Sequence, residues 1–450
     1  MRQLAVIMVV LAGLAIEAQA QSDTTQTLQA LSFHKSQISN LKSQIKSQTS
    51  NLKPQISNLK SQTSNLKSQI MLKRSNPWLT APNAAGLSSY AEDNIAEAEL
   101  TLGSRQGSLT DVSDSPDALQ ANAAVESFFR LSPRTVVFGA MSYDNFSGDD
   151  MVGSAFIDPS RKPFDIVEDS LTNAGRKHRD TYHLTGAVAF TVADGFAVGT
   201  RRTVPDGFAV GTRLDYTAAN YAKYKDLRHK NKLMDLTFTA GFTLTSPLGP
   251  RGRLPKQELS TLNSLITLGA NYLYRRTTES LDFGTYGKGD RVYKSLISYG
   301  PYVGFVEQFG TTGYTDKSRE MPLVSEYVGM GCQLSWDVTP RMQWYSELTY
   351  RRRKGYYGRR SPYTISYNEH GSRLYGCHTR LSLRLPAALH SLDACLNAEN
   401  LELLATSYRE ETGDNTATHY EYYTPVKTAN HLWTEGKVAY TAQWGKQSVE

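Results

Sequence analysis

His178, Asp180 and His183 lie close together in the sequence, and their side chains can transfer protons. Histidine titrates near neutral pH and a carboxylate can orient it, so this spacing allows a hydrolytic site. The alternative, which we favour, is a polar cluster of the loops and lumen without catalytic function. The sequence contains no glycine-rich phosphate loop, no metal-ligand pair at helical spacing and no nucleophile elbow. We therefore predict no enzyme, no cofactor and no metal site.

A second group of charged residues lies on the polar faces of predicted strands whose opposite faces are apolar. An arginine facing the lipid midplane costs ~2–4 kcal/mol, so such charges are expected to point away from lipid. We predict that they face a polar lumen, with the arginines close to the acidic side chains. These lumen-facing candidates are Glu347, Arg380, Arg384, Asp393 and Glu399.

A basic and aromatic stretch, Arg351–Arg360, is predicted to form the tip of a hairpin. Nucleic-acid binding is one interpretation of such a stretch. Contact with anionic lipopolysaccharide, or a solvated loop, is the interpretation we favour, because residues 1–20 predict a signal peptide and hence an exported chain. The net charge of +6 gives no support to nucleic-acid binding, because residues 21–75 hold eight basic residues and one acidic residue. We predict outer-membrane lipid and lipopolysaccharide as partners, and no nucleic acid.

The elements that would position these residues are strands, and Asp235 to Thr245 shows the pattern most clearly. Leu, Phe and Ala alternate there with Asp, Thr and Gly, so one face is apolar and the other polar. The run is about as long as a tilted strand needs to be to cross a bilayer. Similar runs predict strands at 95–102, 121–131, 135–145, 181–192, 266–274, 295–306, 324–336, 342–351, 377–385, 392–399 and 432–444.

These runs predict an all-β fold, a transmembrane antiparallel β-barrel of about 12–14 strands in the bacterial outer membrane. Residues 147–180 and 351–372 are expected to be long loops. Residues 191–201 are nearly repeated at 203–213, and each copy carries an Asp-Gly turn signal. We predict that one copy makes the hairpin turn and that the other is absorbed as an insertion, without adding a strand.

We assign the barrel to residues 76–450. Residues 1–75 lack its alternating strand pattern. Residues 1–20 have a basic start, an apolar core and a small-residue cleavage site, and so predict a signal peptide. Residues 21–75 contain a heptad-like, low-complexity repeat. A short coiled coil is one interpretation. We favour a disordered or weakly helical tail, because Ser and Asn form helices poorly and Pro54 interrupts the repeat.

The chain resembles outer-membrane β-barrels of the Bacteroidota type, in particular a family known only as uncharacterised barrel-like proteins. The resemblance is carried by the junction Ala18-Gln19-Ala20-Gln21 and by Asn83-Ala84-Ala85-Gly86-Leu87, which is similar to an Asn-Pro-Ala-type opening with Ala84 in place of proline. The end Lys446-Gln447-Ser448-Val449-Glu450 lacks the usual final aromatic residue. We therefore expect either an unusual last strand or a chain that stops before the barrel closes.

Three functions fit this architecture. The main hypothesis is a porin-like or transport barrel that passes or binds small hydrophilic or amphipathic solutes through a partly plugged lumen. The second is a surface barrel whose long loops bind an envelope polymer or an unidentified envelope protein. The third, which we favour least, is an outer-membrane hydrolase.

Overall fold

The computed structural model divides the chain into two units, Met1–Ser68 and Gln69–Glu450, and the second is described here by itself. Its described residues are 72–73, 76–92, 94–107, 115–168, 174–194, 207–225, 228–248, 264–284, 293–300, 303–307, 321–339, 341–361, 364–385, 388–405, 408–412, 418–422, 426–444 and 447–449. The predicted signal peptide and nearly all of the predicted repeat tail lie outside these residues, so both remain predictions.

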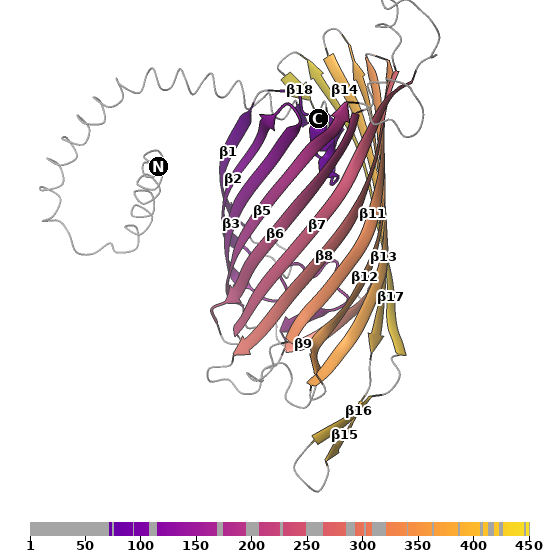
Figure 1. Ribbon diagram of the computed structural model, residues 1–450. Coiled ribbons are helices and arrows are strands. Elements are labelled where there is room, and N and C mark those ends of the chain that lie inside the picture. Colours follow the sequence, from indigo (N-terminus) through magenta and orange to yellow (C-terminus); the bar gives the residue numbers. More distant parts are fainter. Residues whose placement is uncertain are drawn as a thin grey trace, which may run out of the picture. The chain divides into compact units, whose positions relative to one another are not determined.

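The second unit is built around one antiparallel sheet of 13 strands, which curves into a barrel (Figure 1). In sheet order the strands are β1 (Ile95–Gln106), β2 (Asp117–Ser132), β3 (Thr135–Met151), β5 (Gly175–Asp194), β6 (Gly207–Lys223), β7 (Arg228–Leu248), β8 (Ser264–Gly284), β11 (Met321–Thr339), β12 (Met342–Ser361), β13 (Thr364–Arg384), β14 (Ala388–Ala405), β17 (Val426–Trp444) and β18 (Gln447–Val449). The predicted all-β barrel and its predicted number of strands are confirmed.

Smaller elements complete the unit. β4 (Asp165–Glu168), β9 (Tyr293–Gly300) and β10 (Val303–Glu307) form a separate sheet of three strands, and β15 (Tyr408–Thr412) pairs with β16 (Thr418–Tyr422). Two short 3-10 helices, η1 (Pro77–Leu79) and η2 (Ala84–Ser89), precede β1. Within the described residues, no helix has the length and apolar character needed to cross a membrane.

The two faces of the barrel wall follow the alternation seen in the sequence. On β7, Phe238 is 40% exposed and Phe242 46% exposed, whereas Thr239 and Thr243 are buried at 1% and 3%. The apolar side therefore faces outward and the threonine side inward, as predicted for Asp235–Thr245. Large apolar side chains are exposed in the same way on β1, β2, β5, β6, β8, β11, β12, β13, β14 and β17. This outward apolar band is the lipid-facing surface of a transmembrane barrel.

Three predictions about strands and loops need correction. The described residues of the predicted strand 295–306, which are 295–300 and 303–306, fall in β9 and β10 of the small sheet rather than in the barrel wall, because alternation does not say which sheet a strand joins. The stretch Arg351–Arg360 is not a hairpin tip and 351–372 is not a long loop, since β12 continues to Ser361 and pairs with β13, which begins at Thr364. The predicted loop 147–180 is shorter than expected, because β3 extends to Met151 and β5 begins at Gly175.

The tandem duplication adds no strand between β5 and β6. These strands pair directly, with Asp194 opposite Gly207, so the second copy supplies the start of β6. Residues 195–206, which include the rest of the first copy, lie outside the described residues. The absence of an additional strand is confirmed by this pairing, whereas the position of the turn stays a prediction.

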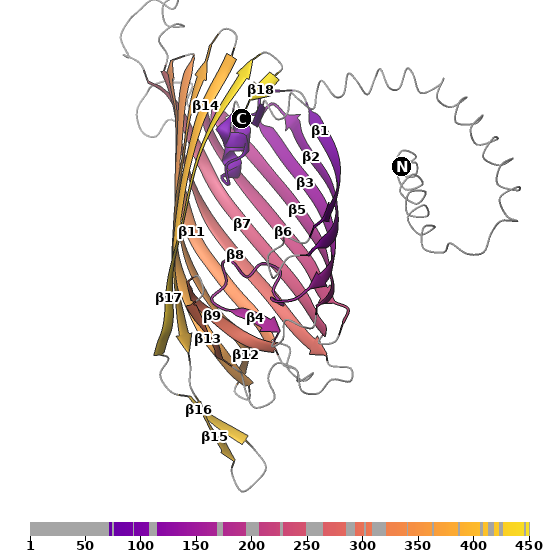
Figure 2. The same ribbon diagram turned by 180° about the vertical axis from the view of Figure 1, so that it is seen from behind.

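Two segments fold into the barrel from opposite ends. One is the N-terminal segment, residues 76–90, which includes η1 and η2. The other is the inward loop, residues 152–168, which connects β3 towards β5 and ends in β4. Figures 1 and 2 show η1 and η2 near the end that carries β18, and β4 near the opposite end. We call these the terminal end and the loop end of the barrel.

Candidate functional site: the occluded lumen

The N-terminal segment lies against the inner wall where three strands present glycines instead of side chains. A methyl group on Gly211 of β6 would collide with the backbone of the segment, and one on Gly241 of β7 with Asn83. A methyl group on Gly269 of β8 would meet the ring of Trp78 at 2.8 Å. These glycines leave the space that the N-terminal segment occupies, so the inner wall is complementary in shape to this segment.

Asn83 is fully buried and joins the N-terminal segment to three strands. Its Nδ2 donates to the carbonyl of Phe242 at 3.1 Å, the carbonyl of Ala270 at 3.3 Å and Oε1 of Gln333 at 3.1 Å. Its Oδ1 accepts from the amide of Ala85 at 3.1 Å, which caps η2. A buried amide with this many partners fixes both the position and the direction of the segment.

Aromatic contacts hold the rest of the segment. Tyr90 stacks on Phe128 with ring centroids 5.4 Å apart, and Trp78 meets Tyr345 edge-to-face at 5.5 Å. Tyr90, Trp78 and Phe128 are buried, so the N-terminal segment supplies much of the packed interior at this end. The lumen is therefore filled at the terminal end by residues that precede the first strand.

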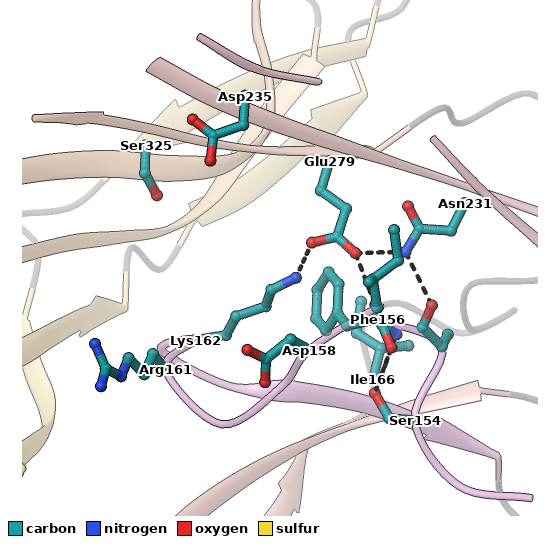
Figure 3. Close-up of polar contacts among 12 residues, drawn as sticks. Ser154, Phe156, Asp158, Arg161, Lys162, Ile166, Asn231, Asp235, Glu279 and Ser325 are labelled. Atoms are coloured by element: carbon teal, nitrogen blue, oxygen red, sulfur yellow. Dashed lines mark hydrogen bonds and ion pairs between the residues drawn. The ribbon is translucent and has the colours of Figure 1, made fainter. Parts of the chain in front are cut away.

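At the loop end, the inward loop is fastened to the wall by a buried ion pair (Figure 3). The Lys162 ammonium contacts the Glu279 carboxylate, and these side chains are 15% and 3% exposed. Glu279 also accepts from Asn231 at 2.5 Å and from the amide of Ile157 at 3.0 Å. Asn231 donates in turn to the carbonyl of Ala155 at 3.0 Å. One carboxylate of β8 thus binds the loop at two positions.

Burial and charge act in opposite directions on Lys162. Burial lowers the pKa of the Lys162 ammonium to about 7, and the carboxylates of Asp158 and Asp165 oppose this shift. The contact with the Glu279 carboxylate also favours the charged ammonium. We take the ion pair as the state at neutral pH because the two groups touch. Burial also raises the pKa of Asp165 to about 6, although Ser154 and the amide of Ile166 donate to it.

Further contacts close the inward loop against the wall. Lys177 donates from Nζ to the carbonyls of Val152 at 3.1 Å and Ser154 at 2.8 Å. The Arg353 guanidinium donates to the carbonyl of Arg161 at 3.0 Å, and the Arg161 guanidinium lies 3.7 Å from the ring centroid of Trp433. Phe156, Phe164 and Ile166 of the same loop are buried. The loop is therefore docked by both apolar packing and polar contacts.

A cavity of about 330 Å³ remains beside the inward loop. Its lining combines loop residues with the inner faces of β14 and β17 and includes Arg161, Lys162, Glu399, His431 and Trp433. Both charge signs and an aromatic ring are therefore present. Such a lining suits a small polar or amphipathic solute.

The five residues predicted to face the lumen differ in burial and in the partners that they contact. Glu347 is buried and accepts from Tyr345 at 3.2 Å and from Gln333 at 3.4 Å, which links it to Asn83. Glu399 is buried and pairs with Arg353 at 3.4 Å, not with the predicted arginines. Arg380 and Asp393 are brought together, with Nε and Oδ1 2.5 Å apart. Arg384 is exposed near the terminal end.

The predicted histidine cluster is divided by the barrel wall. His183 is on the inner-facing side of β5 and bonds Thr217 at 2.7 Å and Thr185 at 3.1 Å. His178 and Asp180 share the outer face with the exposed Tyr182 and bond each other at 3.1 Å. Sequence reasoning missed Lys162, Glu279 and Asn231, whose contacts join positions distant in the sequence. It also missed the N-terminal segment in the lumen, although glycines on the polar faces of three consecutive strands were a signal for it. No group of three or more His, Cys, Asp or Glu side chains suited to a metal ion occurs among the residues described.

Comparisons with known proteins give limited similarity. Residues 84–250 match the model described as Family of unknown function (DUF6850), and no curated protein matches the chain. The chain is similar to the ferripyoverdine receptor of the outer membrane of Pseudomonas aeruginosa, with 11% identity, 78% of this chain and 49% of that chain covered, and a TM-score of 0.32.

Two further solved structures are similar at the same level. BauA, the ferric preacinetobactin receptor of Acinetobacter baumannii, has 8% identity over 79% of this chain and 60% of that chain, with a TM-score of 0.34. Fiu, the ferric-catecholate import receptor of E. coli K12, has 9% identity over 78% of this chain and 63% of that chain, with a TM-score of 0.32. The chain spans less than two thirds of the length of each.

Proposed function

We propose that this chain is an outer-membrane transport barrel that passes small hydrophilic or amphipathic solutes through a lumen closed by its own segments. The observation that carries the proposal is the occupancy of the lumen from both ends. The N-terminal segment fits the glycines of the wall, and the inward loop is held by the Lys162–Glu279 ion pair. Apolar packing and polar contacts hold each segment, and displacement of either one changes the opening.

The outer surface supports membrane insertion with the loop end towards the outside of the cell. The apolar band occupies the middle of the wall, and cationic side chains lie on the outer face nearer the loop end. Such a border suits the anionic headgroups of outer-leaflet lipids, including lipopolysaccharide. The cations that define it are Lys230, Lys232, Arg276, Arg352 and Arg373.

The charged side chains of the inner wall indicate which class of solute the lumen suits. Asp235 and Arg275 form an ion pair at 2.5 Å on this face, and Arg353 and Glu399 form another beside the inward loop. A lumen lined by paired charges solvates polar groups and disfavours bulky apolar ones. Small neutral or zwitterionic polar solutes are therefore the class we propose.

Liposome swelling with solutes of graded size and charge tests this function. Folded wild-type chain is compared with Lys162→Ala, which weakens the docking of the inward loop, and with Gly186→Ala as a control on the outer face, where a methyl group meets nothing within 4 Å. We expect slow swelling for wild type and the control, and faster swelling for Lys162→Ala with small polar solutes. Equal swelling by all three folded proteins, at the level of empty liposomes, would reject the transport function.

A further inference from the structure

A serine, a histidine and an aspartate form a hydrogen-bonded chain on the outer face of the barrel near the loop end. Ser147 of β3 lies directly opposite His178 of β5 in the sheet register, and its Oγ is 2.7 Å from His178 Nδ1. His178 Nε2 is 3.1 Å from Oδ2 of Asp180, which is two residues further along the same strand. The contacts run from a possible nucleophile, Ser147, to a possible base, His178, and then to a carboxylate that can orient this base, Asp180.

The hydrogen bonds around Asp180 favour one tautomer of the imidazole, because the carboxylate lies 3.1 Å from His178 Nε2 whereas Asn145 Nδ2 lies 3.4 Å from it. Oδ1 of Asp180 accepts from the Tyr143 hydroxyl at 2.7 Å and from Asn145 Nδ2 at 2.8 Å. The carboxylate is thereby held in place to accept a hydrogen bond from the protonated His178 Nε2. His178 Nδ1 then carries the free lone pair and accepts from the Ser147 hydroxyl. This tautomer makes His178 a general base towards Ser147.

The surroundings match the border between acyl chains and headgroups of a lipid leaflet. On one side, Leu119 of β2 pairs with Ser147 in the register and is 58% exposed. On the other side, His178 is followed across the sheet by Ala222 and then by the exposed Lys230. Arg176, which pairs with Asp149 at 2.9 Å, lies on the same face. An apolar neighbour and cations thus flank the serine.

We propose that Ser147, His178 and Asp180 form a serine hydrolase site that cleaves acyl esters of outer-leaflet lipids. His178 and Asp180 are 27% and 25% exposed, so the site is accessible from the lipid side rather than from the lumen. Leu119 contacts the acyl chain, and Arg176 and Lys230 attract the anionic headgroup. Ser147 and His178 are the catalytic residues, and Asp180 is a positioning residue.

The reaction consumes one ester and one water. The Ser147 oxygen attacks the ester carbonyl while its proton moves to His178 Nδ1, and Arg176 offers positive charge to the oxyanion. The tetrahedral intermediate expels the alcohol, which takes the proton from His178 and leaves an acyl-serine. Water then attacks the acyl carbon, and its proton passes through His178 as the Ser147 oxygen leaves. The products are a carboxylic acid and an alcohol.

Covalent labelling of the full chain in detergent micelles with a fluorophosphonate probe tests the nucleophile. We expect labelling of wild type and of Ser104→Ala, which removes another exposed hydroxyl opposite Leu119. Labelling should be lost in Ser147→Ala and in His178→Ala. Heat-modifiable gel mobility shows whether each variant is folded. Equal labelling of folded wild type and Ser147→Ala would overturn the proposal.

Hydrolysis of p-nitrophenyl octanoate tests the role of Asp180 separately. Asp180→Asn should lower kcat by about 10³–10⁴-fold with little change in KM, because the side chain orients His178 and does not contact the substrate. A merely structural role would alter folding and KM together. Unchanged hydrolysis by folded Asp180→Asn would contradict the assigned role. Neither result depends on solute transport, since the lumen is not involved.

Discussion

Gly241→Ala adds a methyl group where the N-terminal segment meets the barrel wall. The new carbon would collide with Oδ1 of Asn83 and approach the carbonyl of Ala270. The segment must move away, because the strand backbone cannot shift without disturbing its two neighbours. The hydrogen bonds from Asn83 to Phe242 and Gln333 are then strained or lost.

The size of the effect follows from these contacts. Overpacking a well-packed site costs typically ~1–3 kcal/mol, and each buried polar group left without a partner costs a similar amount. We take about 3 kcal/mol for the docked segment, which corresponds to a roughly 100-fold larger population of the undocked state, since ~1.4 kcal/mol is tenfold. The rest of the barrel should keep its stability.

Hydrogen exchange followed by mass spectrometry measures this population. In the docked segment the amides of Ala85, Gly86 and Tyr90 donate to Asn83 Oδ1, the Asn83 carbonyl and the Leu87 carbonyl. Peptides covering these amides should exchange about 100-fold faster in Gly241→Ala, by the population ratio above. Gly186→Ala, whose methyl group meets nothing within 4 Å, should exchange like wild type. Unchanged protection in folded Gly241→Ala would refute the argument.

Three further predictions concern the inward loop and the lipid-facing wall. Lys162→Met leaves the Glu279 carboxylate buried without its cation, so docking should weaken by ~3–5 kcal/mol and proteolysis of the loop should accelerate; resistance equal to wild type would contradict this. Because burial raises the pKa of Asp165 to about 6, the contribution of Asp165 to docking should be fully present below about pH 4 and lost as pH rises through 6, measured as the difference in protease resistance between wild type and Asp165→Asn at each pH. Asp165→Asn should remove this dependence, and an unchanged pH profile would exclude Asp165 as its source. Phe238→Arg should cost ~2–4 kcal/mol in urea unfolding from lipid, whereas Thr237→Arg on the inner face should cost less; the reverse order would invert the assigned faces.

The wall of the barrel could be predicted from the sequence because its pattern is local. Alternation with period 2 places Leu236 and Phe238 on one face without knowledge of any partner strand. β6 escaped prediction because the duplication obscured where the turn ends and the strand begins. Residues 295–306 were assigned to the wall incorrectly, because a short amphipathic strand fits an internal sheet equally well.

The candidate sites depended on contacts that are distant in the sequence. Asn83 was part of a recognised motif, but its partners Phe242 and Gln333 are 159 and 250 residues away. His178 and Asp180 were identified from their spacing, whereas Ser147 joins them only through the register of β3 and β5. Arg380 and Asp393 were found because they lie on the polar faces of neighbouring strands. Register and loop docking are the two features that local patterns do not specify.

Single-channel conductance in planar bilayers tests most directly whether the N-terminal segment and the inward loop close the lumen. The decisive protein combines Gly241→Ala with Lys162→Ala, so that the docking of both segments is weakened in one folded barrel. We predict that wild type is closed for most of the recording and that the combined variant conducts steadily, with each single variant between them. A combined variant that is folded and inserted but conducts no more than wild type would contradict the claim that the two segments close a pathway through this barrel.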